Sequence, residues 1–263
     1  DYVLTENEGL HTGSSDNPYI GINVGEKGVA WRKIRVKGTP GHGSAPFKTD
    51  NALVRAAAVV QRLADYRPPA KFHELWRQQV DILDVDQETK ETMLDANRIE
   101  DWLDDHPVEG LARHFYSCTH TTFSPNVVES SRRMKTNVIP DQLDINVDIR
   151  TLPGESTAEV QAHLDEALGD LAGQVDVEII MNDPASISQM DNPMWDTIQK
   201  AVNQPFPSAR LSPQLIVGFT DARVYRNLGS VAYGAGLFSP DLKASDFQTR
   251  FHGHDERIDL ESL

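Results

Sequence analysis

The clearest hydrophobic pattern in the chain is a strict alternation of polar and apolar residues over Asp144–Arg150. A period of two is typical of a strand with one buried face, so Ile145, Val147 and Ile149 are expected to pack on a core. The opposite face of this strand then presents polar groups, which are those of Asp144, Asn146, Asp148 and Arg150.

Two segments carry the longer period of amphipathic helices. The first begins at Thr49, the expected N-cap, and runs to about Asp65 through a stretch rich in alanine and leucine. The second covers Ser156–Leu171, where Ser156 and Glu159 have the spacing of a capping box. A charged segment with aromatic and leucine anchors, from about Ala70 to Phe115, is expected to form packed surface helices.

The order of these elements predicts the fold class. With strands at Val29–Val36 and Val175–Met181, the middle of the chain is an α+β sandwich with an antiparallel sheet and a helical insertion. After Asn182, expected helices at 194–202 and 221–228 alternate with extended pieces at 215–218 and 230–233, which favours part of an α/β sheet. Asp1–Leu4 is a short apolar stub, and Glu6–Pro18 is expected to be a loop.

Composition narrows the function classes. The length of 263 residues favours two packed units, and a net charge of −15 argues against binding to phosphate backbones and so against nucleic acids. No apolar run reaches the roughly 18 residues of a membrane span. The single cysteine, Cys118, makes no internal disulfide and favours a reducing, cytoplasmic location. The excess of acid fits either an ordinary solvated surface or salt adaptation, and the sequence does not decide between them.

Three stretches carry groups suited to chemistry. Phe251–Arg257 places two histidines beside two carboxylates, which are natural Zn²⁺ ligands, although acidic residues also favour a helix N-terminus. Gly38–Pro46 surrounds His42 with glycines, as either an exposed binding tip or a plain turn. Asn137, before the alternating strand, offers an amide donor, and Arg150 at its end offers a guanidinium fork for a carboxylate. Each stretch alone is more often structural.

Together, five ordered motifs are much more specific. They are GTPGHGSAP, NVIP with DIRTLPG downstream, FTDARVYRNLG, YGAG and HGHDER. In this order the chain resembles the M20 family of metallopeptidases and amidohydrolases, which includes aminoacylases, carboxypeptidases and succinyl-diaminopimelate desuccinylases. The resemblance covers nearly the whole chain.

The resemblance implies an α/β catalytic domain with two zinc ions and an inserted α+β lid that mediates homodimerisation. On this chain the lid would cover residues 20–183, with the helical insertion at about 70–115 extending it or shaping specificity. Residues 1–19 and 184–263 would belong to the catalytic domain. The implied substrate is a small peptide or an N-acyl amino acid with a free carboxylate.

The resemblance also assigns roles to individual residues. His252 and Glu6 match metal ligands, with Glu8 as the competing alignment for Glu6. His42 and Asn137 match lid residues that bind the reacting carbonyl. The expected substrate-binding residues are Arg150, Arg223, Gly234 and Gly236.

Motifs of the family's first half are absent in a matching context, including its His-x-Asp, its bridging aspartate and its Glu-Glu pair. The one His-x-Asp, His163–Asp165, falls within a predicted helix and is expected to be a surface pair. Because the sequence also starts at Asp1, the chain is expected to be the C-terminal portion of a zinc-dependent amide hydrolase and to be inactive alone. The alternative is a non-catalytic dimerisation or binding module.

Overall fold

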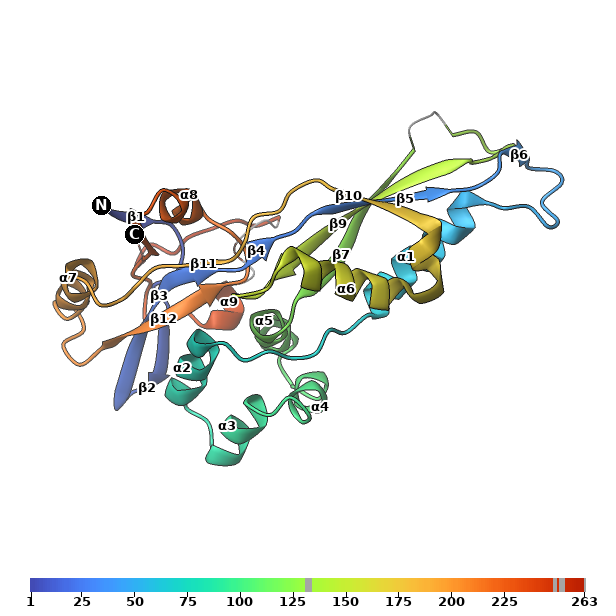
Figure 1. The fold of residues 1–263 in the computed structure, drawn as a ribbon. Coiled ribbons are helices and arrows are strands. Elements are labelled where there is room, and N and C mark those ends of the chain that lie inside the picture. The colour runs from blue at the N-terminus through green and yellow to red at the C-terminus, as the bar shows by residue number, and fades with distance from the viewer. Residues whose placement is uncertain (131–133, 248–249, 251–253, 263) are drawn as a thin grey trace. The chain divides into compact units, whose positions relative to one another are not determined.

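The computed structural model describes residues 1–130, 134–247, 250 and 254–262, and it divides the chain into two compact units. The first unit consists of Asp1–Lys27, Pro69–His120 and Ala185–Leu263. The second unit consists of Gly28–Pro68 and Thr121–Pro184. Figure 1 shows the elements of both.

The second unit is a two-layer sandwich of one antiparallel sheet and two helices (Figure 1). Its strands are β4 (Gly28–Val29), β5 (Arg32–Lys37), β7 (Thr122–Glu129), β9 (Gln142–Thr151) and β10 (Val175–Ile179). The helices α1 (Ala52–Asp65) and α6 (Thr157–Leu168) pack against each other and share one core with the sheet. A short ladder of β6 (Gly41–His42) and β8 (Val138–Ile139) and a 3₁₀ turn at Gly169–Gln174 complete it.

The strand β9 explains this packing. Ile145, Val147 and Ile149 are all at most 1% exposed and lie in the core with apolar residues of both helices, as the alternation predicted. The predicted capping box is confirmed, because Glu159 N–H donates to Ser156 Oγ and Ser156 N–H donates to Glu159. The α+β sandwich with an antiparallel sheet is therefore present in this unit.

The first unit is built on a mixed sheet with β3 (Asn17–Glu26) at its centre. The other strands are β1 (Tyr2–Thr5), β2 (His11–Ser14), β11 (Ser186–Ile187), β12 (Arg210–Ile216) and β13 (Val231–Gly234). β1 is parallel to β13, and β12 is parallel to β3. One core cluster joins β3 and β12 to α7 (Pro193–Val202), while α8 (Ala222–Asn227) contacts β13 and α9 (Ala244–Phe247) follows it in the chain.

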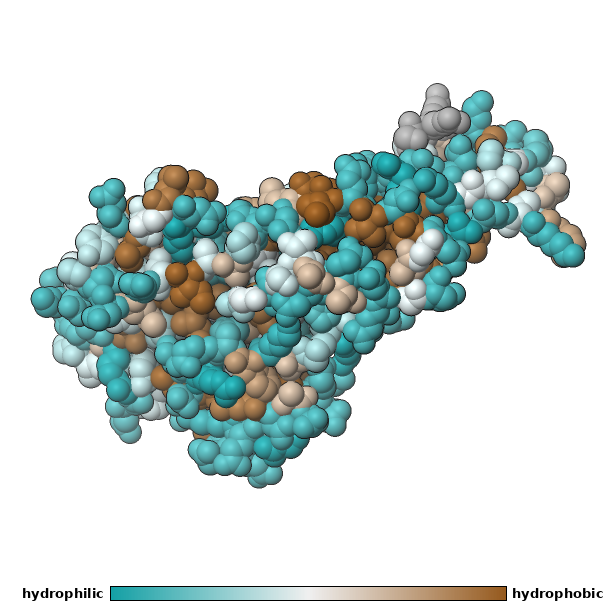
Figure 2. Space-filling model, in the orientation of Figure 1, coloured by the Kyte–Doolittle hydropathy of each residue, from teal (hydrophilic) through white to brown (hydrophobic). Residues whose placement is uncertain are grey.

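The helical insertion also belongs to the first unit. It contains α2 (Glu74–Ile82), α3 (Gln87–Met93), α4 (Ile99–Asp104) and α5 (Glu109–Thr119), as expected for a helical segment. Its own apolar cluster includes Trp76, Met93 and Ile99, and α2 packs on β12. Its outer surface is strongly hydrophilic (Figure 2) because acidic side chains face solvent there, namely those of Asp81, Asp84, Asp86, Glu88, Glu91, Asp101, Asp104 and Asp105.

The division of the chain differs from the expected boundaries in two places. Residues 20–27 group with the first unit because β3 pairs with β2 and β12 there. The insertion groups with the first unit, and not with the sandwich that it interrupts, because α2 packs on β12.

Two local predictions are wrong. Glu6–Pro18 is not a continuous loop, because β2 and the start of β3 form a hairpin in which Ser14 pairs with Asn17. Its glycines and polar residues leave no alternation of apolar residues from which a strand could be predicted. The N-cap of α1 is Asn51, whose side chain accepts the Leu53 N–H at 2.9 Å, whereas the Thr49 hydroxyl donates to the Pro46 carbonyl.

Candidate functional site

The most unusual backbone of the first unit is the Glu6–Gly9 turn, which follows β1 at its carboxyl end. Asn7 and Glu8 have φ angles of 74° and 65°, and Gly9 has a φ of 108°. Left-handed conformations in residues other than glycine cost free energy and persist only where the surroundings hold them. Such strain is concentrated at functional sites in many proteins, so the turn is the candidate site of this unit.

Glycines allow the rest of the unit to close around this turn. Gly9 N–H donates to the Gly21 carbonyl at 2.9 Å, and Gly236 N–H donates to the Glu8 carbonyl at 3.0 Å. A Cβ on Gly9 would lie 2.3 Å from the Gly236 backbone, and one on Gly234 would lie 2.3 Å from the Glu6 carbonyl oxygen. Gly234 and Gly236, which the sequence assigned to substrate binding, thus lie directly against the turn.

The two glutamates of the turn have different environments. Glu6 is exposed, and its carboxylate accepts the Asp221 N–H at 3.2 Å, just before α8. Glu8 is half-buried, and its Oε2 lies 2.7 Å from the position that a Cβ on Gly21 would occupy. Burial raises the pKa of the Glu8 carboxyl to about 7, because desolvation disfavours the charged form. A carboxyl group of this kind is suited to proton transfer or to binding a cation.

A polar layer borders Glu8 on the same face of the sheet. Gln214 on β12 lies beside Gly21, since its Cγ is 3.2 Å from the position of a Cβ there. The Gln79 side chain on α2 donates to Gln214 Oε1, and Gln214 in turn donates to Ser212 Oγ at 2.7 Å. The helical insertion therefore contributes a side chain to the surroundings of the turn, which sequence reasoning did not anticipate.

Arg223 lies on α8, where its guanidinium stacks over the Phe219 ring at 4.8 Å. Three residues on, the Arg226 side chain is 4% exposed and donates to Glu26 at 2.8 Å, and Glu26 also accepts the Thr220 N–H at 2.6 Å. This buried ion pair holds α8 against β3. No local pattern in the sequence pointed to it, because its two charges are 200 residues apart.

In the second unit, the structure brings His42 and Asn137 together. Gly43 N–H donates to the Asn137 carbonyl at 2.8 Å in the short β6–β8 ladder, and both side chains are on exposed residues. The His42 Nδ1 lies 2.7 Å from Ser44 Oγ. These residues form an exposed tip in which Lys48 has a left-handed φ of 57° and Phe47 is 83% exposed.

Arg150 is not part of this tip. It lies near the end of β9 opposite to the tip, roughly 25 Å along the strand from Gln142 at about 3.3 Å a residue. Its guanidinium makes a two-point contact with the Asp148 carboxylate, at 2.7 and 3.1 Å. Within the second unit, the predicted substrate-binding residue is thus separated from the predicted carbonyl-binding pair.

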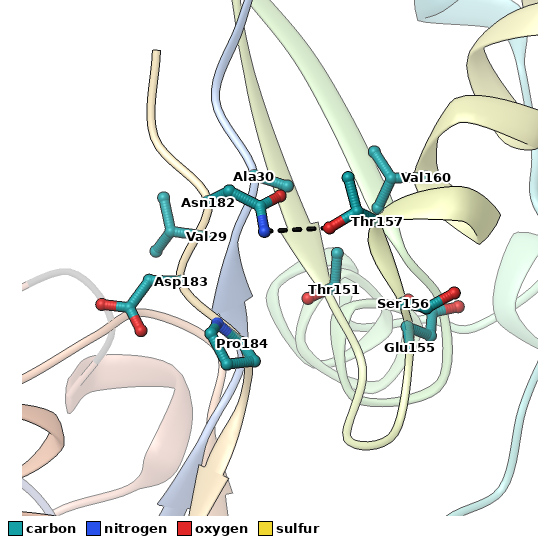
Figure 3. A pocket seen from close by; sticks show the side chains of 10 residues that line it. All are labelled: Val29, Ala30, Thr151, Glu155, Ser156, Thr157, Val160, Asn182, Asp183 and Pro184. Carbon is teal, nitrogen blue, oxygen red and sulfur yellow. Dashed lines mark hydrogen bonds between the residues drawn. The ribbon is translucent and has the colours of Figure 1, made fainter. Parts of the chain in front are cut away.

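The second unit also contains a cavity of about 330 Å³ between β4, β9 and the start of α6 (Figure 3). Asn182 Nδ2 donates to Thr157 Oγ1 at 3.0 Å, so these two polar groups satisfy each other at its wall. Glu155 lines the cavity, while its Oε2 accepts from the Leu152 N–H and the Thr121 hydroxyl. None of the residues predicted for the site lines this cavity.

The interpretation of His163–Asp165 as a surface pair is wrong for its histidine. His163 is 9% exposed, and the Tyr66 hydroxyl lies 2.7 Å from its Nδ1, whereas Asp165 is exposed. The reason is helical periodicity, because His163 shares the core-facing side of α6 with Val160 and Leu164.

His252, the predicted metal ligand near the C-terminus, lies outside the described residues. Within the part of the chain that the structure describes, no group of three His, Cys, Asp or Glu side chains could hold a metal ion. These residues alone do not fit a complete metal centre. No helix among them is long and apolar enough to cross a membrane.

Comparison with known families gives a match over more than half of the chain. A family model described as the peptidase dimerisation domain, M20_dimer, matches residues 24–176.

Curated proteins also match along nearly the whole chain. Probable carboxypeptidase S-like 2 of Dictyostelium discoideum is 26% identical over 251 residues, covering 93% of this chain and 46% of that protein. N-fatty-acyl-amino acid synthase/hydrolase PM20D1 of Bos taurus is 28% identical over 254 residues, covering 93% of this chain and 48% of that protein. The chain spans about half the length of the curated relatives that it matches.

Solved structures share the fold. The M20 family metallo-carboxypeptidase Sso-CP2 from Sulfolobus solfataricus has a TM-score of 0.57 and 17% identity, covering 89% of this chain and 55% of that chain. Human carnosine dipeptidase 1 has a TM-score of 0.60 and 16% identity, covering 98% of this chain and 55% of that chain. At these identities the likeness concerns the mixed α/β fold alone.

Proposed function

Because the chain belongs to the M20 family of peptidases, we propose that the complete protein hydrolyses an amide bond in a small peptide or an N-acyl amino acid. The observation that carries the proposal is the Glu6–Gly9 turn, in which glycines hold a half-buried carboxyl group in a strained backbone. The names of relatives support the substrate class, since they include a carboxypeptidase and N-fatty-acyl-amino acid hydrolases.

We further propose that the complete protein depends on zinc, with Glu8 rather than Glu6 and with His252 as the ligands from this chain. Glu8 is favoured because it is half-buried, whereas Glu6 is exposed and already accepts a backbone N–H. Bound zinc would polarise the scissile carbonyl and activate water. The remaining ligands would come from the part of the relatives that this chain does not match.

The second unit is proposed to act as the dimerisation lid. Its family match supports a homodimer, and the exposed tip supports a role for His42 and Asn137 at the reacting carbonyl of a partner subunit. Arg223, rather than the Asp148-bound Arg150, is the better candidate for the substrate carboxylate. A cytoplasmic location remains an expectation from the lone Cys118.

An assay of amide hydrolysis tests the proposal. The complete protein with zinc should release free amine from dipeptides or N-acyl amino acids, and a chelator should abolish the reaction. Glu8→Gln should lower the rate at least about 100-fold. Removing a residue that only hydrogen-bonds to a metal ligand already costs about 10–100-fold, and removing a ligand itself should cost more. Glu6→Gln is the matched control and should have a smaller effect. A zinc-loaded protein that cleaves none of these substrates would contradict the proposal.

We propose that the 263-residue chain alone forms a dimer and does not hydrolyse these substrates. Taken alone, it would then act as the non-catalytic dimerisation or binding module named as the alternative above. Light scattering after size exclusion would measure the dimer. Two tightly bound zinc ions per chain, or turnover by this chain, would contradict the view that its site is incomplete.

A further inference from the structure

Gly21 lies inside the strand β3, where a glycine contributes little to the strand itself. A glycine within a strand has no side chain to pack, and it often marks a place where another group approaches closely. The backbone of Gly21 does not have a positive φ, so its conformation does not require a glycine. Its presence therefore indicates that the space beside its Cα is used by another group.

The Glu8 carboxylate occupies this space. A Cβ on Gly21 would lie 2.7 Å from Glu8 Oε2 and 3.7 Å from Glu8 Cδ. The Gly21 backbone also binds the chain that follows, since it accepts the Gly9 N–H at 2.9 Å and donates to the Leu10 carbonyl at 3.0 Å. Because Oε2 is at the end of a flexible side chain, a methyl group on residue 21 would displace the carboxylate and leave the backbone in place.

Gln214 on β12 borders the same space over Gly21. Its Cγ lies 3.2 Å from the position of a Cβ there, on the side of the strand where Glu8 Oε2 lies. The Gln214 amide is held at both of its polar atoms, because Oε1 accepts from Gln79 and Nε2 donates to Ser212 Oγ at 2.7 Å. Hydrogen bonds at the end of a side chain restrict its rotamers, so the stem of Gln214 keeps its place.

Gln79 provides this support from the helical insertion. It is 8% exposed on α2, the helix that packs on β12. A second helix of the insertion, α5, also comes near Glu8. Burial raises the pKa of the Cys118 thiol on α5 to about 12, and the negative charge of Glu8 adds to this rise, so the two groups are within electrostatic reach. The insertion therefore approaches the surroundings of Glu8 with both helices.

We propose that Gly21 and Gln79 are positioning residues that together fix the Glu8 carboxylate. Gly21 leaves the space that the carboxylate occupies, and Gln79 holds Gln214 at the border of that space. This inference rests on the proposed function, in which Glu8 is a metal ligand, and it gives the helical insertion a role at the site. Neither residue belongs to the motifs of the family resemblance.

NMR spectroscopy of the 263-residue chain tests the inference without metal or turnover. At about pH 9 the Glu8 carboxyl group is ionised, so its ¹³Cδ signal reports its surroundings, and Glu8→Gln assigns that signal. The signal should shift in Gly21→Ala, where the added methyl group displaces the carboxylate. It should also shift in Gln79→Met, which keeps the length of the side chain but removes its hydrogen bond to Gln214.

Each variant has a matched control on the same element. Gly25→Ala adds a similarly crowded methyl group to β3, against β11 and not against the turn. Gln78→Met removes a hydrogen bond of 3.0 Å within α2 itself. Neither control should move the Glu8 signal. If Gly21→Ala does not fold, Gln79→Met still decides, because methionine fills nearly the same volume as glutamine.

Zinc binding by the complete protein links this positioning to the proposed function. Gly21→Ala and Gln79→Met should each raise the zinc dissociation constant about 10–100-fold, which is the range for groups that orient a metal ligand. The two control variants should leave the dissociation constant nearly unchanged. Competition with a chelator of known zinc affinity measures these constants.

An unmoved Glu8 signal in both Gly21→Ala and Gln79→Met would overturn the inference, and so would equal shifts in the controls. A shift in Gly21→Ala alone would overturn the role of Gln79 and of the insertion. Failure of the proposed function looks different, because the complete protein would then neither bind zinc nor hydrolyse its substrates while the shifts in the 263-residue chain still appeared.

Discussion

One polar site in the sheet of each unit shows how the two units differ. In the second unit, charged side chains of the sheet pair on its polar face, as Arg35 does with Asp144 at 3.0 Å. In the first unit, the Asn23 amide is buried without partners among the described residues, and the Glu6–Gly9 turn is strained. Sites under strain are expected where chemistry rather than stability determines the sequence. We infer that the sandwich of the second unit is mainly a scaffold, whereas the first unit carries the strained turn with Glu8, the proposed metal ligand.

One part of the second unit departs from this contrast. Among the described residues, left-handed conformations outside glycine occur at Asn7, Glu8 and Lys48. Lys48 belongs to the exposed tip that carries His42. Backbone strain therefore appears in both units beside residues to which the family resemblance gives a role.

The largest expected effect is in the core of the scaffold. Ile145→Ala should lower the free energy of unfolding by about 2–5 kcal/mol, because it leaves a cavity under two helices. Hydrogen exchange should show the loss of protection in residues 28–68 and 121–184. Ile179→Ala, at a residue 55% exposed, is the control and should cost far less. Equal loss of protection in both units would break the distinction drawn between them.

The next effect concerns the strained turn. Gly9→Ala should lower the free energy of unfolding by about 2 kcal/mol or more, because it adds a Cβ at a positive φ and against the Gly236 backbone. Gly154→Ala is a matched control in the second unit, with a φ of 88° but open space around the added Cβ, so its cost should be about 1 kcal/mol. Chemical denaturation measures both. Equal costs would show that the glycine packing around the turn contributes nothing.

The helical insertion and the second unit should also differ in their response to acid. Burial lowers the pKa of His73 and of His114 in the insertion below the ordinary value of 6.5. The folded state then binds fewer protons than the unfolded state, so stability is complete above about pH 6.5 and falls as the pH drops toward the folded pKa. The slope is at most about 1.4 kcal/mol per pH unit for each histidine.

In the second unit, stability also falls as the pH falls, but the loss begins at a lower pH. The hydrogen bond from Arg35 lowers the pKa of Asp144, so its contribution is retained above about 3.8 and lost only in stronger acid. Protection from hydrogen exchange should therefore weaken between pH 7.5 and 5.5 in the insertion and not in the sandwich. His114→Gln should reduce this pH slope.

The smallest effect is at the edge of the scaffold sheet. Lys37 and Asp176 form an ion pair at 2.5 Å with both side chains more than 60% exposed. Such pairs contribute about 0–1 kcal/mol, so Lys37→Ala should change the melting temperature little, and less in high salt. A large loss would mean that surface pairing, and not the apolar core, stabilises the sandwich.

The sequence predicts local structure correctly where neighbouring residues alone determine it. The alternation in β9 and the capping box of α6 were read directly from neighbouring residues. The N-cap at Asn51 was misplaced by two residues, because Thr49 and Asn51 are both competent caps and only the backbone selects one.

The features of the site depend on contacts between distant residues. No local pattern shows that Gly234 meets the turn at Glu6, or that Gln79 reaches Gln214. The family resemblance assigns roles to Glu6, with Glu8 as the alternative, and to Gly234 and Gly236, and the structure places the two glycines against the turn that holds both glutamates. The prediction for His163 is wrong for another reason, because recognising the helix does not by itself tell which of its faces is buried, and His163 lies on the buried face with Val160 and Leu164.

The two ends of the helical insertion lie close together, and this affects how the segment can change during evolution. Lys71 N–H donates to the Thr119 carbonyl at 2.8 Å, so the segment leaves and returns at one point. A loop that starts and ends at one place can change length at little entropic cost, about 0.6 kcal/mol for each doubling. Evolution can therefore lengthen, shorten or exchange this segment, and with it Gln79, which donates to Gln214, while the strands on either side of it keep their register.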